Sequence, residues 1–209
     1  EMNLPDADRR AEILNECAFE LQSIFSGSVS RLLEDSSHKV SGSKGAYAQL
    51  AKLSAFKDPL KKKSSAFLMT VHFSGLWEIE DQVNVLPMID YHRMRLLCRT
   101  GCIEVNDQNV LERLIEQKPV SKEVEQSIRR AASEVCKAVV ELTQIPMFDF
   151  DVLIWAHARS CCRDHPVCIS GKVQNDSFYS YLDKNFAGRC EFQEWCPGFR
   201  DVSVRSLWE

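Results

Sequence analysis

The sequence LIWAHARSCC, from Leu153 to Cys162, joins a helical pattern to a group of cysteines. The pattern predicts a short apolar helix over residues 148–160, with Asp149 or Asp151 at its start. Five of the nine cysteines crowd into the last quarter of the chain, namely Cys161, Cys162, Cys168, Cys190 and Cys196. We therefore expect a helical protein that ends in a cysteine-rich loop.

The rest of the chain carries the same helical spacing, with apolar residues recurring every three or four positions. Helix start signals lie at Pro5-Asp6, Asp58-Pro59, Asp90 and Ser121. A surface loop is expected over residues 36–45, which are rich in Ser and Gly. The sequence contains no alternating strand pairs, heptads or internal repeat, so the predicted fold class is all-α.

The composition and the lengths of the apolar runs exclude further classes of protein. The 209 residues include 26 Lys and Arg against 30 Asp and Glu, a net charge of −4, and 44% are hydrophobic. Such a chain can bury a core and is not generally basic. Its longest apolar runs fall far short of the ~20 residues that span a bilayer, and no leader pattern opens it. We expect a cytoplasmic protein, or a nuclear one in a eukaryote, without a membrane partner.

The clustered cysteines form two short pairs, Cys161-x6-Cys168 and Cys190-x5-Cys196, separated by 21 residues. Thiolates at such spacings can converge on one centre, and four sulfur ligands suit tetrahedral zinc or an iron–sulfur cluster. The pairs are wider than the C-x2-C knuckles usual for zinc, which favours a cluster. Cys162 can replace Cys161, which gives x5 in place of x6. The alternatives are reduced cysteines without metal and two disulfides.

Residues 153–168 and 190–197 resemble the tail of the iron–sulfur members of the helix-hairpin-helix DNA glycosylase superfamily, which includes endonuclease III and the adenine-mismatch glycosylase. The resemblance extends over residues 58–197 and implies a two-lobed helical fold. It implies a 4Fe-4S cluster, with zinc as the alternative, held by Cys161, Cys168, Cys190 and Cys196. We expect one all-α unit over 1–209, with lobes at 1–89 and 90–160 and a cluster loop at 161–197 that is expanded by an insertion at 169–189.

Two further segments resemble catalytic motifs of this family. Asp90-Tyr91-His92 is similar to a segment in which a catalytic carboxylate stands at a helix start, and Lys62-Lys63-Ser64 resembles the helix whose first residue is a nucleophilic lysine in lyase members. The resemblance implies catalytic roles for Asp90 and for Lys62 or Lys63. The alternative interpretations are that Asp90 only caps a helix and that the lysines form a solvated basic patch.

The chemistry of these residue types agrees with the implied roles. Cleavage of an N-glycosidic bond builds positive charge on the sugar, so a fixed carboxylate stabilises the transition state and can orient the attacking water. A lysine of lowered pKa can form a Schiff base with the sugar. His92 is expected to be structural. Trp77, Tyr91 and Trp155 could stack a flipped base, although such residues more often belong to the core.

Three functions are consistent with the sequence. The first is a DNA N-glycosylase that removes a damaged or modified base, with lyase activity undecided. The second is an N-glycosidase acting on a free modified nucleoside or nucleotide, because residues 123–130 and 151–155 also resemble the queuosine salvage glycosidases. The third is a non-catalytic, metal-stabilised module that binds nucleic acid or protein. The charge of −4 and Asp58-Pro59-Leu60, where the family has Gly-hydrophobic-Gly, favour the second, whereas the cysteine tail favours the first.

Overall fold

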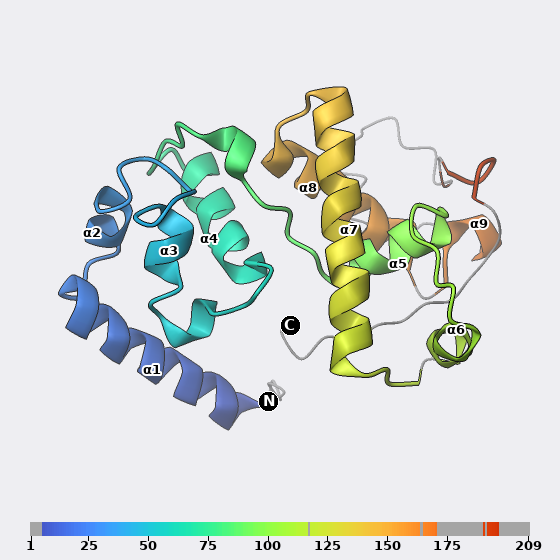
Figure 1. The fold of residues 1–209 in the computed structure, drawn as a ribbon, viewed down its shortest axis with the longest axis horizontal. Helices are drawn as coiled ribbons and strands as arrows, with labels where there is room; N and C mark the ends of the chain where they lie inside the picture. Colours follow the sequence, from blue (N-terminus) through green and yellow to red (C-terminus); the bar gives the residue numbers. More distant parts are fainter. Residues whose placement is uncertain (1–5, 117, 164, 171–189, 191, 197–209) are drawn as a thin grey trace. The chain divides into compact units, whose positions relative to one another are not determined.

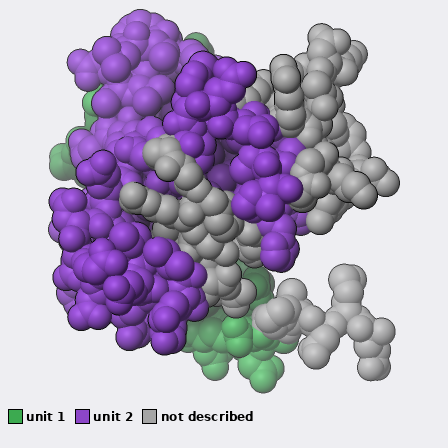
Figure 2. Space-filling model, turned by 90° about the vertical axis from the view of Figure 1, so that its right-hand side faces the viewer, with its two compact units in different colours: residues 1–88 green, residues 89–209 purple. Residues whose placement is uncertain are grey.

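The computed structural model describes residues 6–116, 118–163, 165–170, 190 and 192–196 (Figure 1). Every regular element within these ranges is helical, which confirms the predicted all-α class for this part of the chain. The chain divides into two compact units, residues 1–88 and residues 89–209 (Figure 2). No helix of the described ranges is long and apolar enough to cross a membrane. Most of the expected insertion, residues 171–189, lies outside the described residues.

The described part of each unit is built from helices joined by loops. The first unit contains α1 (Ala7–Phe25), α2 (Val29–Glu34), α3 (Ala46–Leu50), η1 (Ser54–Phe56), α4 (Lys62–Phe73) and η2 (Gln82–Asn84). The second contains α5 (Tyr91–Arg99), α6 (Gln108–Ile115), α7 (Lys122–Thr143), α8 (Met147–Ser160) and α9 (Val167–Ser170). Four of these helices begin at a side-chain cap, provided by Ser28, Asp90, Asp107 and Ser121.

Helix α4 begins at Lys62, later than the Asp58-Pro59 signal indicates. Lys61 adopts a left-handed φ of 60°, which separates the turn at residues 58–61 from the helix. Asp58 still caps this helix, because its Oδ2 atom accepts a hydrogen bond from the Lys62 backbone N–H at 2.8 Å. Gly75, with a φ of 68°, follows the end of the helix, where a left-handed residue is common.

The second unit has its core between α5, α7 and α8, because α5 packs against both of the other helices. The main cluster of buried apolar side chains consists of Ile89, Met94, Leu97, Cys98, Ile103, Leu114, Ile128, Ala132 and Cys136. A smaller cluster joins Leu96 of α5, Ala158 of α8 and Cys162. This smaller cluster fixes the residues that follow α8 against α5.

The four cysteines outside the tail stand singly in helix-like sequence, which predicts that they are small buried hydrophobes, namely Cys17, Cys98, Cys102 and Cys136. Cys98 and Cys136 are buried in the second unit, and burial raises the pKa of the Cys136 thiol to about 12. Cys17 is half-buried and Cys102 is exposed, so the expectation is wrong for these two. Cys102 faces solvent because it follows Gly101, whose φ of 74° begins the turn after α5.

Candidate functional site

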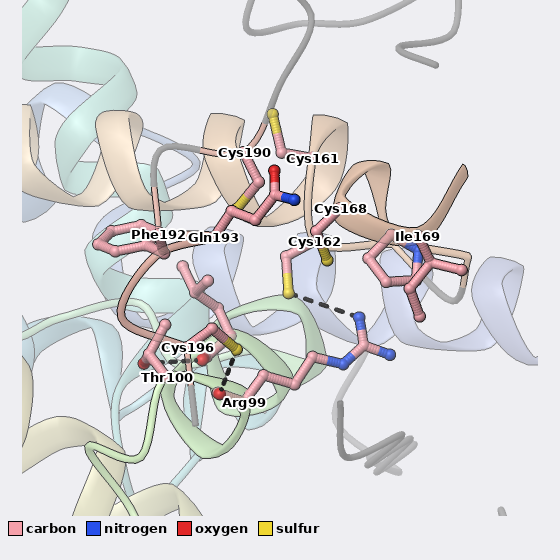
Figure 3. A pocket seen from close by; sticks show the side chains of 12 residues that line it. Arg99, Thr100, Cys161, Cys162, Cys168, Ile169, Cys190, Phe192, Gln193 and Cys196 are labelled. Atoms are coloured by element: carbon pink, nitrogen blue, oxygen red, sulfur yellow. Dashed lines mark hydrogen bonds between the residues drawn. The ribbon is translucent and has the colours of Figure 1, made fainter. Parts of the chain in front are cut away.

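The five clustered cysteines line one cavity of about 190 Å³ in the second unit (Figure 3). We call it the thiol cavity. Its walls come from the C-terminal end of α5, the residues after α8, the start of α9 and residues 190, 192, 193 and 196. The structure thus brings together cysteines that are separated by 21 residues in the sequence, as their spacing predicts.

Cys190 lies within electrostatic range of three other tail cysteines, namely Cys162, Cys168 and Cys196. Burial is the main cause that raises the pKa of the Cys190 thiol; a backbone hydrogen bond with Phe192 lowers this pKa, and negative charge at the other three cysteines raises it further. The Cys161 sulfur, in contrast, points away from the other four (Figure 3). The geometry therefore favours Cys162 over Cys161 as the fourth thiol, which makes the two pairs Cys162-x5-Cys168 and Cys190-x5-Cys196.

The chemistry of this donor set fits a metal that prefers sulfur. Four cysteines, once deprotonated, are the ligands of structural zinc sites and of iron–sulfur clusters. As the side chains lie, no group of three or more His, Cys, Asp or Glu residues in the described ranges is arranged to hold a metal ion. The Cys196 thiol instead donates to the Arg99 carbonyl at 2.8 Å. Metal binding would require this thiol to lose its proton and turn from the carbonyl.

Two arginines of α5 hold the start of the cysteine segment. Arg95 Nε donates to the Cys162 carbonyl at 2.8 Å, and Arg99 Nη1 donates to Cys162 Sγ at 3.4 Å and also to the Arg163 carbonyl. Burial raises the pKa of the Cys162 thiol, whereas the positive charges of Arg99 and Arg95 lower it. Arg95 lies in the segment that resembles the family's aspartate-led motif, whereas no sequence motif includes Arg99. Their four-residue spacing on a helix, which places both on one face, was the available signal.

One histidine lies beside the thiol cavity. His157, in the last turn of α8, is buried, and its Nε2 atom is 3.8 Å from Cys190 Sγ. Its ring meets the edge of the Phe192 ring with 4.8 Å between the ring centroids. His157 stands only four residues before Cys161, but no sequence pattern indicates that its ring reaches Cys190, which lies 33 positions further along the chain.

Asp90 caps α5 and also forms a buried ion pair with Arg93. Its Oδ1 atom accepts a hydrogen bond from the Arg93 backbone N–H at 3.0 Å, and its Oδ2 atom is 3.1 Å from Arg93 Nη1. The capping role that the alternative interpretation expected is thus present. It is compatible with catalysis, because a cap and a charge-stabilising group both need the ionised carboxylate.

The side chain of Arg93 connects Asp90 with Asp151 of α8. Its Nη2 atom donates to the Asp151 carbonyl at 3.0 Å. Its Nε atom is 3.0 Å from Asp151 Oδ1, an ion pair that is too poorly aligned for a hydrogen bond. All three side chains are buried, with exposed fractions of 6% for Asp90, 3% for Arg93 and 0% for Asp151. We call them the Asp90–Arg93–Asp151 network.

Lys62 and Lys63 lie in the first turn of α4, in the first unit, whereas Asp90 lies in the second. Both lysines are half-buried, and the two serines that follow them are fully buried. Intermediate burial agrees neither with a fully solvated patch nor with a deeply desolvated amine. A joint site of these lysines and Asp90 stays a prediction.

His92 and two of the three aromatic residues, Tyr91 and Trp155, belong to the second unit but do not line the thiol cavity. Burial is the main cause that lowers the pKa of His92 to about 4, and its Nδ1 atom is 3.2 Å from Arg95 Nη2. A neutral ring that accepts from Arg95 agrees with the expected structural role. Trp77 is buried in the first unit. The Tyr91 ring is tilted against the His92 ring, with 3.9 Å between the ring centroids, and Trp155 lies under the Arg159 guanidinium, 5.0 Å from the ring centroid.

Comparison of the chain with models of protein families, with curated proteins and with solved structures found no match. The resemblance to the glycosylases is therefore carried by the motif residues alone. The function has to be argued from the thiol cavity and the Asp90–Arg93–Asp151 network.

Proposed function

We propose that the protein is a DNA N-glycosylase that uses the Asp90 carboxylate and holds a metal centre in the thiol cavity. The observation that carries this proposal is the convergence of the tail cysteines on the C-terminal end of α5, the helix that Asp90 caps. One helix therefore connects the proposed catalytic carboxylate with the proposed metal centre.

The proposed metal ligands are four cysteines that line the thiol cavity, Cys162, Cys168, Cys190 and Cys196. The centre is a 4Fe-4S cluster in this proposal, with zinc as the alternative, because both take four thiolates. When bound, such a group cross-links the segment after α8 to residues 190 and 196. Burial raises the pKa of the Cys162 thiol overall, and the guanidinium groups of Arg99 and Arg95 support the proposal by reducing this shift.

The chemistry proposed for Asp90 is electrostatic. As the base departs, positive charge develops on the sugar, and a fixed carboxylate nearby lowers the energy of that transition state. The carboxylate can also orient the attacking water. The cap hydrogen bond and the ion pair with Arg93 hold Asp90 in one orientation before a substrate binds. Lys62 and Lys63 are the candidate nucleophiles for an additional lyase step.

Two alternatives each have an observation in their favour. The net charge of −4 favours a free modified nucleoside or nucleotide as the substrate, because duplex DNA is strongly anionic. The cap hydrogen bond and the ion pair engage both oxygens of Asp90, which favours a non-catalytic, metal-stabilised module. The experiment below separates all three functions.

The proposal is tested by single-turnover base release. The substrates are duplex oligonucleotides that each carry one deaminated, oxidised or alkylated base, together with the matching free nucleosides. Asp90→Asn is compared with Asp107→Asn, because Asp107 caps α6 through a similar hydrogen bond to the Val110 N–H at 3.1 Å and Asn preserves a cap. We expect Asp90→Asn to lower the rate about 100-fold or more and Asp107→Asn to leave it unchanged.

Two other outcomes of this experiment would each support one of the alternative functions. Base release from nucleosides but not from duplexes would replace DNA by a free nucleoside as the substrate. An inactive wild-type protein, or an active Asp90→Asn variant, would contradict the catalytic proposal and favour the binding module.

A further inference from the structure

We propose that Arg93 and Asp151 are positioning residues that set both the orientation and the effective charge of Asp90. This inference rests on the proposed function, since it deepens the account of the same site. It starts from the Asp90–Arg93–Asp151 network, in which one buried guanidinium lies between two buried carboxylates from different helices.

The geometry gives Arg93 two separate tasks. Its backbone N–H and its Nη1 atom engage the two oxygens of Asp90, while its Nε and Nη2 atoms engage the side chain and the carbonyl of Asp151. A planar guanidinium can serve two partners at once because its donors point in fixed, different directions. Asp151 therefore fixes Arg93 from α8, and Arg93 fixes Asp90 at the start of α5.

The presence of a second carboxylate has an electrostatic consequence. A lone buried guanidinium beside Asp90 would neutralise the negative charge that the proposed reaction needs. Asp151 shares this cation, so Asp90 keeps more of its ability to stabilise a developing positive charge. Asp151→Asn would leave Asp90 as the carboxylate paired with Arg93, while the hydrogen bond from Arg93 to the backbone carbonyl of residue 151 would remain. The Asp90 carboxylate would then be less effective although it is still in place.

A further buried arginine, from helix α7, contacts the backbone directly before Asp90. Arg129 is 1% exposed, and its Nη2 atom donates to the Ile89 carbonyl at 3.0 Å. The peptide group that precedes Asp90 is therefore held by α7, while the Asp90 side chain is held through Arg93 by α8. A backbone anchor of this kind limits how far Asp90 can shift when Asp151 is changed.

The test compares Asp151→Asn with Asp149→Asn in the base-release assay. Asp149 is the matched control, since it is an exposed aspartate in the first turn of the same helix. We expect Asp151→Asn to lower kcat about 100-fold with a nearly unchanged KM, as misplacement or neutralisation of a catalytic group does. Asp149→Asn should match the wild type.

A second comparison separates positioning from general damage to the fold. In the Asp90→Asn background, Asp151→Asn should cause no further loss of rate, because a residue that acts through Asp90 has nothing left to act on. Arg93→Lys serves where Asp151→Asn fails to fold, since it keeps the charge but cannot hold both carboxylates. It should lower kcat while the thermal midpoint stays close to that of Asp149→Asn.

The outcomes distinguish this inference from the proposed function. Wild-type kcat in Asp151→Asn or Arg93→Lys, together with a large loss in Asp90→Asn, would overturn the positioning role alone. Equal further losses in both backgrounds would also overturn it, because they would show general damage. An inactive wild-type protein would overturn the proposed function and this inference with it.

Discussion

The side chain of Cys162 points toward the same cavity as three other thiols, whereas the sulfur of its neighbour Cys161 points away (Figure 3). We therefore expect Cys162→Ser to abolish metal binding and Cys161→Ser to preserve it. The measurement is the metal content per chain of both variants after identical anaerobic purification. Metal loss in Cys161→Ser with retention in Cys162→Ser would show that Cys161 is the ligand.

His92 makes the stability of the second unit depend on pH. Burial lowers its pKa in the folded protein from the ordinary value of 6.5 to about 4, so the unfolded chain binds the proton more readily. The free energy of unfolding should therefore be highest above pH 6.5 and fall as the pH is lowered from 6.5 toward 4. Chemical denaturation across this range measures the effect.

His92→Gln should flatten this part of the pH profile, because an amide oxygen can still accept from Arg95 but does not titrate. His165→Gln is the control, since His165 is an exposed histidine of the same unit. Parallel profiles for the wild type and His92→Gln would show that another group causes the pH dependence.

Single residues also show how far the sequence predicts the site. Asp90 as a helix cap and the grouping of the tail cysteines follow from local signals, namely a capping residue before an apolar pattern and short cysteine spacings. The contact of Arg93 with Asp151 does not, since the two residues are 58 positions apart and no local pattern links them. The choice between Cys161 and Cys162 depends on the direction of each side chain after α8, which spacing does not define.

At the scale of elements, helix boundaries were predicted best where the caps are local. Helix α8 begins at Met147, one residue before the predicted start, because Pro146 precedes it directly. Helix α4 begins at Lys62, well after Asp58-Pro59, because the left-handed Lys61 intervenes. Asp58 is a capping residue, as predicted, but its carboxylate accepts from the Lys62 N–H across the turn at residues 58–61. Sequence spacing does not distinguish this geometry from a cap directly before the helix.

The segment that leads to η2 is fixed to the loop before α3 by one carboxylate. Asp81 Oδ1 accepts from the Val40 N–H at 2.6 Å, and Oδ2 accepts from the Ser41 N–H at 3.1 Å and the Ser41 hydroxyl at 2.6 Å. Burial raises the pKa of Asp81, but these hydrogen bonds outweigh it and lower the pKa overall. The carboxylate therefore stabilises the first unit in its ionised form.

We expect Asp81→Ala to lower the free energy of unfolding by about 2 kcal/mol at neutral pH, since hydrogen bonds to a charged group are lost. The difference from the wild type should shrink as the pH falls through the lowered pKa of Asp81, because the protonated carboxyl is a weaker acceptor. Urea unfolding followed by circular dichroism measures both effects. Asp35→Ala, at an exposed aspartate after α2, is the control, and an equal loss there would contradict the account.

For the whole molecule, the helical class and the absence of strands among the described residues follow from apolar periodicity, which is a property of long segments and tolerates local errors. The function, in contrast, does not follow from apolar periodicity or from composition. Net charge and composition describe averages over the chain, whereas recognition of DNA or of a nucleoside depends on where a few charged side chains lie. Although the chain has a net negative charge, it contains a local cluster of positive charge at Lys61, Lys62 and Lys63.

Binding of the whole protein to duplex DNA should depend on salt. A phosphate contact contributes about −0.9 to the slope of log affinity against log salt concentration. We expect Lys63→Ala to reduce the steepness of this slope by about one and to weaken binding to all duplex sequences alike. Fluorescence anisotropy over a salt series measures the slope, with Lys137→Ala on α7 as the control. A slope that is the same for Lys63→Ala and the wild type would exclude Lys63 as a phosphate contact.

The central claim is that four tail cysteines hold a metal centre against the helix that Asp90 caps. Its most direct test is the iron, sulfide and zinc content of anaerobically purified wild-type protein, measured together with its visible absorption spectrum. We predict about four irons and four sulfides per chain with broad absorption in the blue, as expected for a 4Fe-4S cluster. One zinc per chain would keep the thiolate site but contradict the cluster, and a metal-free protein would contradict the claim itself.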